Sequence, residues 1–122
     1  MKDEEVRDLG ARTREYALRV IRLADALPRS AVGKVLGTQV LLSGTSVGAH
    51  YREAHRARSN AEVVSKLEGA LQELEESAYW LELIRDAELQ PSERLEPLLT
   101  ETNELISILV TMVKRVKARA KR

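Results

Sequence analysis

The sequence predicts an all-α protein that folds as an antiparallel, up-down-up-down four-helix bundle, in one domain over residues 1–122. Apolar residues recur at steps of three and four in four separate stretches, which is typical of helices with one buried face. Short connections containing proline or serine separate these stretches, and short connections favour antiparallel neighbours. Aromatic residues make up only 3% of the chain and Phe is absent, so the expected core is aliphatic.

The first helix is expected over about residues 5–27. Pro28 ends it, because proline lacks an amide proton and disfavours helical geometry in the residue before it. Ser30 can then cap the start of the next helix. Thr13 fills the one polar slot in a stripe that is otherwise apolar and consists of Leu9, Tyr16, Val20, Leu23 and Leu27.

The second helix is expected over residues 31–58. Its middle, residues 43–48, contains two glycines, two serines and a threonine. These residues lower helix propensity, by up to about 1 kcal/mol for glycine, so a local break is the alternative. A continuous helix is preferred, because no proline is present and small residues let a neighbouring backbone approach closely. The expected buried side comprises Val32, Val35, Leu36, Val40, Val47, Tyr51 and Ala54.

The third helix is expected over residues 60–88, after a capping-box pattern formed by Ser59 and Glu62. A connection around Pro91 separates it from the fourth helix, which is expected over residues 92–118. Because proline is best tolerated in the first turn of a helix, Pro97 suggests a start a few residues after Ser92. The buried face of the third helix is expected at Val63, Leu67, Ala70 or Leu71, Leu74, Ala78, Leu81 and Ile84.

Composition excludes several classes of protein. The chain has no Cys, which rules out disulfides, thiolate nucleophiles and zinc-thiolate sites and fits a reducing cytoplasm. Its acidic N-terminus lacks the apolar core of a signal peptide, and its longest apolar run is far shorter than a membrane span. A net charge of +1 provides no strong overall attraction to nucleic acid or to a membrane, so any electrostatic argument must be local.

The charges are unevenly distributed along the chain. Residues 68–104 contain eleven acidic and two basic residues, whereas residues 114–122 contain six basic residues and no acid. In the predicted topology this basic tail, the end of the second helix and the start of the first helix meet at one pole. Asp3, Glu4 and Glu5 are expected there too and would partly neutralise the bases.

The candidate nucleic-acid site is the set of bases at this pole. Arginine and lysine suit phosphate contacts, although the bases also compensate the negative ends of two helix dipoles. Tyr51 is expected to be buried and provides no stacking surface. The candidate residues are Arg52, Arg56, Arg58, Lys114, Arg115, Lys117 and Arg119. Alternatively, the acidic and basic regions meet between copies of the chain, with Glu68, Glu75 or Glu82 near arginines of a neighbour.

No motif predicts catalysis, a metal or a cofactor. His50 and His55 are five residues apart, whereas helical metal ligands use three or four. The serines and the threonine in residues 43–46 have no suitably placed histidine and acid, and helical hydroxyls usually bond to a carbonyl of the preceding turn. The segment is therefore assigned to helix packing or an oligomer interface, through Gln39, Ser43, Gly44, Thr45, Ser46, Gly48, His50 and Tyr51.

Residues 35–83 resemble the four-helix-bundle protein family associated with intervening sequences of bacterial 23S ribosomal RNA genes. The resemblance rests on a glutamine before a Ser-Gly-Thr-Ser-Val-Gly-Ala run, a basic stretch, a serine, a Lys-Leu pair and a Tyr-Trp-Leu ending. These fall on Gln39, residues 43–49, residues 52–58, Ser59, Lys66, Leu67, Tyr79, Trp80 and Leu81. His50 departs from the pattern, because the family usually has asparagine there.

The resemblance implies a homopentameric ring of bundles, no known catalysis and suspected nucleic-acid binding. A distantly similar bundle is an accessory protein of diversity-generating reverse transcriptases, which provides an analogy for partner binding. Two functions are therefore carried forward. The first is a non-enzymatic, homo-oligomeric bundle that binds RNA or DNA through its basic surface. The second is a scaffold that recruits another protein and makes no direct contact with nucleic acid.

Overall fold

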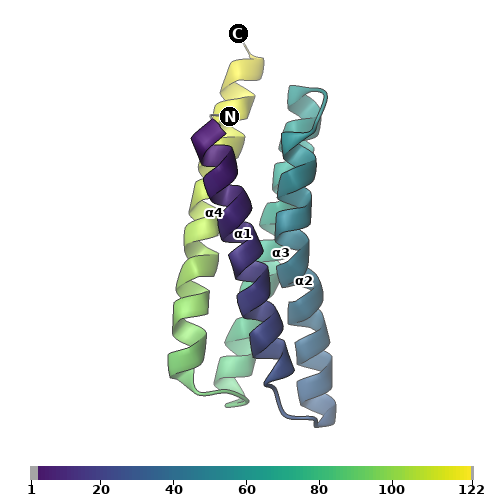
Figure 1. Cartoon of the computed structure of the whole chain (residues 1–122), viewed down its shortest axis with the longest axis vertical. Coiled ribbons are helices and arrows are strands. Elements are labelled where there is room, and N and C mark those ends of the chain that lie inside the picture. The colour runs from purple at the N-terminus through teal and green to yellow at the C-terminus, as the bar shows by residue number, and fades with distance from the viewer. Residues whose placement is uncertain (1–2, 122) are drawn as a thin grey trace.

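A computed structural model describes residues 3–121, and the side chains of residues 8–121, as four α-helices. They are α1 (Asp3–Asp25), α2 (Ala31–His55), α3 (Asn60–Asp86) and α4 (Ser92–Ala120). Each helix runs opposite to the one before it, so the start of α1 and the end of α4 lie together at the top of Figure 1. Consecutive helices pack against each other and α4 closes the ring against α1, most sparsely of the four pairs. The predicted four-helix, all-α fold is confirmed.

Serine caps start two of the helices as expected. The Ser30 hydroxyl accepts a bond of 3.1 Å from the Gly33 amide, and the Ser59 hydroxyl accepts one of 3.1 Å from the Glu62 amide. α2 is a continuous helix through residues 43–48, as preferred, but it ends at His55 rather than at residue 58. The chain has to reverse direction before Ser59, whose extended backbone starts α3, so residues 56–58 form the turn.

The end of α3 has a Schellman motif. Glu88 adopts the left-handed conformation with φ 57°, its amide bonds to the Arg85 carbonyl, and the Leu89 amide bonds to the Ile84 carbonyl, both at 3.0 Å. The helix therefore ends at Asp86, two residues before the expected boundary.

The start of α4 differs from the sequence-based argument. The helix begins at Ser92, so Pro97 lies in its second turn. The proline removes the amide that would bond the Glu93 carbonyl. Both residues are exposed, and water can bond to a carbonyl freed on the surface of a helix.

The buried side of α2 combines glycines with Val40, Val47 and Tyr51, whose predicted burial is confirmed. Gly33, Gly37 and Gly44 are buried, whereas Val32 and Val35 are 53% and 60% exposed, so their predicted burial is wrong. The cause is the close approach of α1 and of the connection that follows it. A Cβ at position 33 would lie 2.0 Å from the Pro28 carbonyl oxygen, and one at position 44 would lie 2.8 Å from both Val20 methyl carbons. Glycine faces these segments, and Val32 and Val35 therefore point outward.

The core is aliphatic, as expected, but polar bonds cross its middle. Thr102 Oγ1 donates to the Leu98 carbonyl at 2.8 Å, so the Tyr16 hydroxyl, 2.7 Å away, donates to Thr102. In a second pair, Ser77 Oγ donates to Ser43 Oγ at 2.8 Å. These two pairs join α1 to α4 and α3 to α2.

Candidate nucleic-acid interface

The predicted basic residues gather at one end of the bundle. We call this set the basic pole; its described members come from the end of α2 with the following turn, and from the last two turns of α4. Figure 1 shows both helix ends at the same end of the molecule, at the top of the view. All are exposed: Arg52, Arg56, Arg58, Lys114, Arg115, Lys117, Arg119 and Lys121.

Two ion pairs through α3 show that the two clusters lie at similar heights. The Lys66 ammonium of α3 lies 2.8 Å from the Glu53 carboxylate of α2, and the Lys117 ammonium of α4 lies 3.6 Å from the Glu68 carboxylate of α3. Lys66 and Glu68 are two residues apart, a rise of about 3 Å. Arg52 and Lys117 therefore lie at nearly the same level along the bundle axis.

Most charges of the basic pole are not neutralised within the described residues. Lys117 has Glu68 as a partner, but both side chains are about half exposed, and such pairs contribute little. The pKa of Glu53 is lowered chiefly by its hydrogen bond with Lys66, so this carboxylate is already engaged. Arg115 makes an interaction of its own. No ion pair with a described residue involves Arg52, Arg56, Arg58, Lys114, Arg119 or Lys121.

The expected acidic contribution from the N-terminus concerns Asp3, Glu4 and Glu5. The backbone of these residues starts α1 beside the end of α4. Their side chains lie outside the part of the structure that is described, so their expected effect on the basic pole stays a prediction.

The small residues of the second helix face two different neighbours. Gly44 and Gly48 face α1, where Cβ atoms would lie 2.8 Å from Val20 and 3.3 Å from Thr13. Ser43 faces α3 through its bond with Ser77, and Tyr51 is buried. Gln39 is exposed, whereas Thr45 and Ser46 are half-buried and their hydroxyls donate to the Leu41 and Leu42 carbonyls of the preceding turn.

His50 lies between α2 and α3. A Cβ at Gly69 would lie 3.1 Å from its Nδ1 atom, so glycine at that position makes room for the imidazole ring. The Nδ1 atom is buried and has no hydrogen-bond partner among the described residues. Glu73 of α3 lies nearby. Burial raises the pKa of the Glu73 carboxyl, and Glu76 raises it further. Among the described residues, no group of three His, Cys, Asp or Glu side chains could hold a metal ion.

The polar bonds across the core were missed as a site feature. Burial raises the pKa of Tyr16, which keeps the hydroxyl protonated as the donor to Thr102. The sequence indicated part of this arrangement, because Tyr16 and Thr102 both stand among apolar residues at helical spacing, where a buried hydroxyl needs a partner. Ser77 was missed entirely, since its neighbour Ala78 was expected at the buried position that Ser77 occupies.

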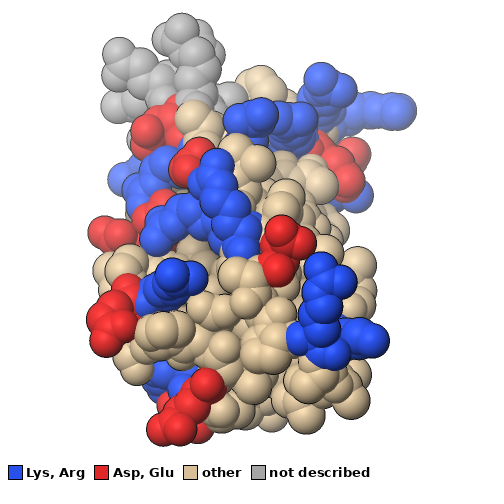
Figure 2. All heavy atoms as spheres, turned by 60° about the horizontal axis from the view of Figure 1, so that its bottom comes forward, with Lys and Arg blue, Asp and Glu red and all other residues tan. Residues whose placement is uncertain are grey.

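A second surface of interest is the outer side of α2. We call it the α2 outer face; its large apolar side chains are Val32, Val35, Leu41 and Leu42, and Leu42 is 60% exposed. Figure 2, which brings the bottom of Figure 1 forward, shows a broad uncharged area on the visible side of the molecule, bordered by charged groups. An apolar helix side of this kind is typical of a contact with another protein surface.

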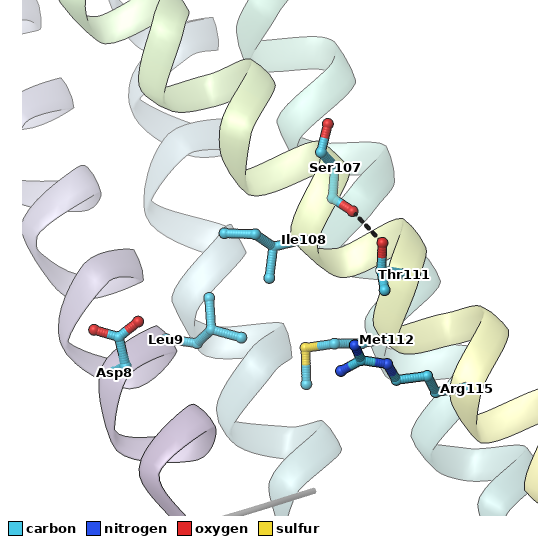
Figure 3. A pocket seen from close by; sticks show the side chains of 7 residues that line it. All are labelled: Asp8, Leu9, Ser107, Ile108, Thr111, Met112 and Arg115. Carbon is cyan, nitrogen blue, oxygen red and sulfur yellow. Dashed lines mark hydrogen bonds between the residues drawn. The ribbon is translucent and has the colours of Figure 1, made fainter.

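A cavity lies where α1 and α4 pack most sparsely. It has a volume of about 320 Å³, with apolar walls from Leu9, Ile108 and Met112 and charged groups from Asp8 and Arg115 (Figure 3). Arg12 of α1 also forms an ion pair with Glu101 of α4, and its Nε atom donates to Glu101 over 3.2 Å. This pair and the Tyr16–Thr102 bond join α1 to α4, the two neighbouring helices that pack most sparsely.

No described helix is both long and apolar enough to cross a membrane. The family model for the 23S rRNA-intervening sequence protein matches residues 8–111. The chain is also similar to the crystal structure of a protein of unknown function from the S23 ribosomal protein family of Bacteroides thetaiotaomicron. The TM-score is 0.83 and the sequences are 36% identical, over 93% of this chain and 99% of the other. No curated protein gives a significant match. This chain therefore belongs to the family of 23S rRNA-intervening sequence proteins, as its sequence resemblance indicated.

Proposed function

We propose that this protein is a non-enzymatic, homo-oligomeric four-helix bundle that binds nucleic acid through its basic pole. The observation that carries the proposal is the gathering of eight exposed bases from two segments far apart in the sequence at one end of the bundle. Exposed arginine and lysine groups bind phosphates and release counterions, which is the main source of affinity in sequence-independent binding.

The helix dipoles alone do not account for these bases. Each helix C-terminus carries the equivalent of about half a negative charge, so the ends of α2 and α4 together amount to roughly one charge. The starts of α1 and α3 lie at the same pole and contribute the opposite sign. The basic pole therefore has far more positive charge than dipole compensation requires.

A filter-binding titration against structured RNA and DNA tests the nucleic-acid proposal. We expect binding at low salt that weakens steeply as salt is added, because counterion release is lost. Alanine at Arg52, Arg56 and Arg58 should reduce the affinity strongly, whereas alanine at Arg29 and Lys34, at the opposite end of the bundle, should not. Absence of binding at low salt would exclude this function.

The α2 outer face supports self-association. Its valine and leucine side chains are exposed to water, and contact with a second copy would cover them. The family resemblance implies five copies in a ring. Sedimentation velocity on the full chain tests this. Leu42→Glu should yield monomers, whereas the control Val110→Glu, on α4, should leave the assembly intact. A wild-type protein that sediments as a monomer would contradict the proposal.

A protein-interaction scaffold is the second candidate function, and the same α2 outer face favours it. In that case another protein covers the apolar side chains and any contact with nucleic acid is indirect. A pull-down from the native host, with and without nuclease, separates the two functions. A partner that stays bound after nuclease treatment and is lost with Leu42→Glu would support the scaffold. A cytoplasmic location remains a prediction from the absence of Cys.

A further inference from the structure

The two basic clusters lie on opposite corners of the bundle. α2 packs against α1 and α3, and α4 packs against α3 and α1, but within the described part of the chain the backbones of α2 and α4 do not approach each other closely. Neighbouring helix axes are about 8–10 Å apart, so opposite axes are separated by about 11–14 Å. The bases therefore form two ridges rather than one patch: the α2 ridge (Arg52, Arg56, Arg58) and the α4 ridge (Lys114, Arg115, Lys117, Arg119, Lys121).

Each ridge presents charges in a row along its helix. Arg52 and Arg56 are four residues apart and Lys117 and Lys121 likewise, so each pair stacks one turn above the other on the same side of its helix. The ion pairs made by Lys66 and Glu68 show that the two ridges lie at about the same height along the axis. The result is two parallel rows of exposed cations on opposite corners of the bundle, whose charged ends extend outward and therefore lie farther apart than the helix axes.

Surfaces that bind single strands use aromatic rings on which bases stack. The chain has four aromatic residues in total. Tyr16 and Tyr51 are buried, and Tyr79 and Trp80 lie near the far end of α3, roughly 28 Å along the helix from its start at the basic pole. His55 is the one exposed ring among the described residues of the pole.

We infer that the basic pole binds double-stranded nucleic acid by its two sugar-phosphate backbones, with one ridge on each strand and without reading bases. This inference rests on the proposed function and names its substrate class. A single strand can follow only one ridge at a time, whereas a duplex engages both. Recognition through phosphates alone is independent of sequence and depends strongly on salt.

Fluorescence anisotropy with the full chain tests the inference. The probes are a labelled RNA duplex and a labelled DNA duplex of the same mixed sequence, each of about two helical turns, and the separate strands of each. We expect at least about tenfold tighter binding to one or both duplexes than to any single strand. The ratio of the affinities for the RNA and DNA duplexes then shows which of the two forms the protein binds more tightly.

Three double variants remove the same amount of charge. R52A/R56A disrupts the α2 ridge, K114A/R119A disrupts the α4 ridge, and R29A/K34A is the matched control at the opposite end of the bundle. Each ridge variant should lower the slope of log affinity against log salt for a duplex by about 2 and remove the preference for duplexes. The control should change neither quantity, and H55A should leave duplex binding within about twofold.

The outcomes are distinguishable. Single strands that bind as tightly as duplexes, with affinity still dependent on the ridge residues, would overturn the inference and leave the proposed function standing. Loss of binding in H55A, or equal losses in the control and the ridge variants, would also overturn it. No complex with any probe at low salt would exclude the proposed function itself.

Discussion

The close approach of α1 and α2 leads to a testable effect at Gly44. In Gly44→Ala the new methyl carbon would lie 2.8 Å from both Val20 methyl carbons and 3.1 Å from its Cβ atom. Val20 is fully buried and β-branched, so its χ1 angle cannot turn to make room. We expect α1 to be pushed outward, at a cost of about 1–3 kcal/mol for overpacking.

A helix-propensity gain opposes this cost. Replacing glycine by alanine inside a helix contributes about 1 kcal/mol of stability, so Gly44→Ala should be net destabilising by up to about 2 kcal/mol. Gly10→Ala is the matched control, because it also lies inside a helix and, apart from its own helical turns, no described atom lies within 4 Å of its new methyl group. That variant should be more stable than wild type by about 0.5–1 kcal/mol.

Urea denaturation followed by circular dichroism measures both variants. Protein concentration has to be equal throughout, because self-association would add to the apparent stability. The double variant Val20→Ala/Gly44→Ala should be less destabilised than the sum of its two single variants, since the clashing methyl groups are gone. If Gly44→Ala stabilised the protein as much as Gly10→Ala, the proposed packing of α1 on α2 would be wrong.

Three further predictions concern the core and the helix ends. Tyr16→Phe removes the donor to Thr102 and should lower the free energy of unfolding by about 1 kcal/mol in a urea titration. Because the folded pKa of Tyr16 is raised, its contribution is complete below the ordinary tyrosine pKa and is lost as pH rises through the folded value; the phenylalanine variant should lose less stability in that alkaline range. Glu88→Gly should raise thermal stability by about 1 kcal/mol, since glycine adopts φ 57° without strain, and a Glu88→Ala variant that matched it would contradict this reason. Glu101→Gln weakens the partly exposed ion pair with Arg12 and should cost about 1 kcal/mol, with a smaller effect in high salt that a salt series in the same urea assay would reveal.

Helix positions followed from the sequence because local chemistry decides them. Pro28, Ser30, Ser59 and Pro91 mark the connections, and α2 and α3 begin at their expected residues. α4 begins at Ser92, the expected boundary, and not a few residues later as Pro97 suggested. The ends of α2 and α3 differ from the expected residues, because both depend on how the chain turns toward the next helix. At the end of α3 the turn places Glu88, which carries no glycine signal, in the left-handed region.

The candidate site, too, could be predicted from the sequence only in part. The antiparallel topology was enough to bring the two basic segments to one pole, since the ends of the second and fourth helices must then meet there. Their arrangement as two ridges on opposite corners could not be predicted from the sequence, because it depends on which helices pack against each other. The α2 outer face was missed for the same reason: apolar periodicity assigned Val32 and Val35 to the core.

The sequence alone therefore determined the class of fold, the order and span of the helices and the presence of two basic segments. These depend on periodicity, capping and charge, which act within a few residues of each other. Tertiary structure decided which side of α2 is buried, since hydrophobicity favours Val32 and Val35, but the closeness of α1 and of the connection after it leaves room only for glycine at positions 33 and 44. It also decided the buried partners of Tyr16 and Ser43 and the spacing of the ridges, because each requires residues from different helices to meet.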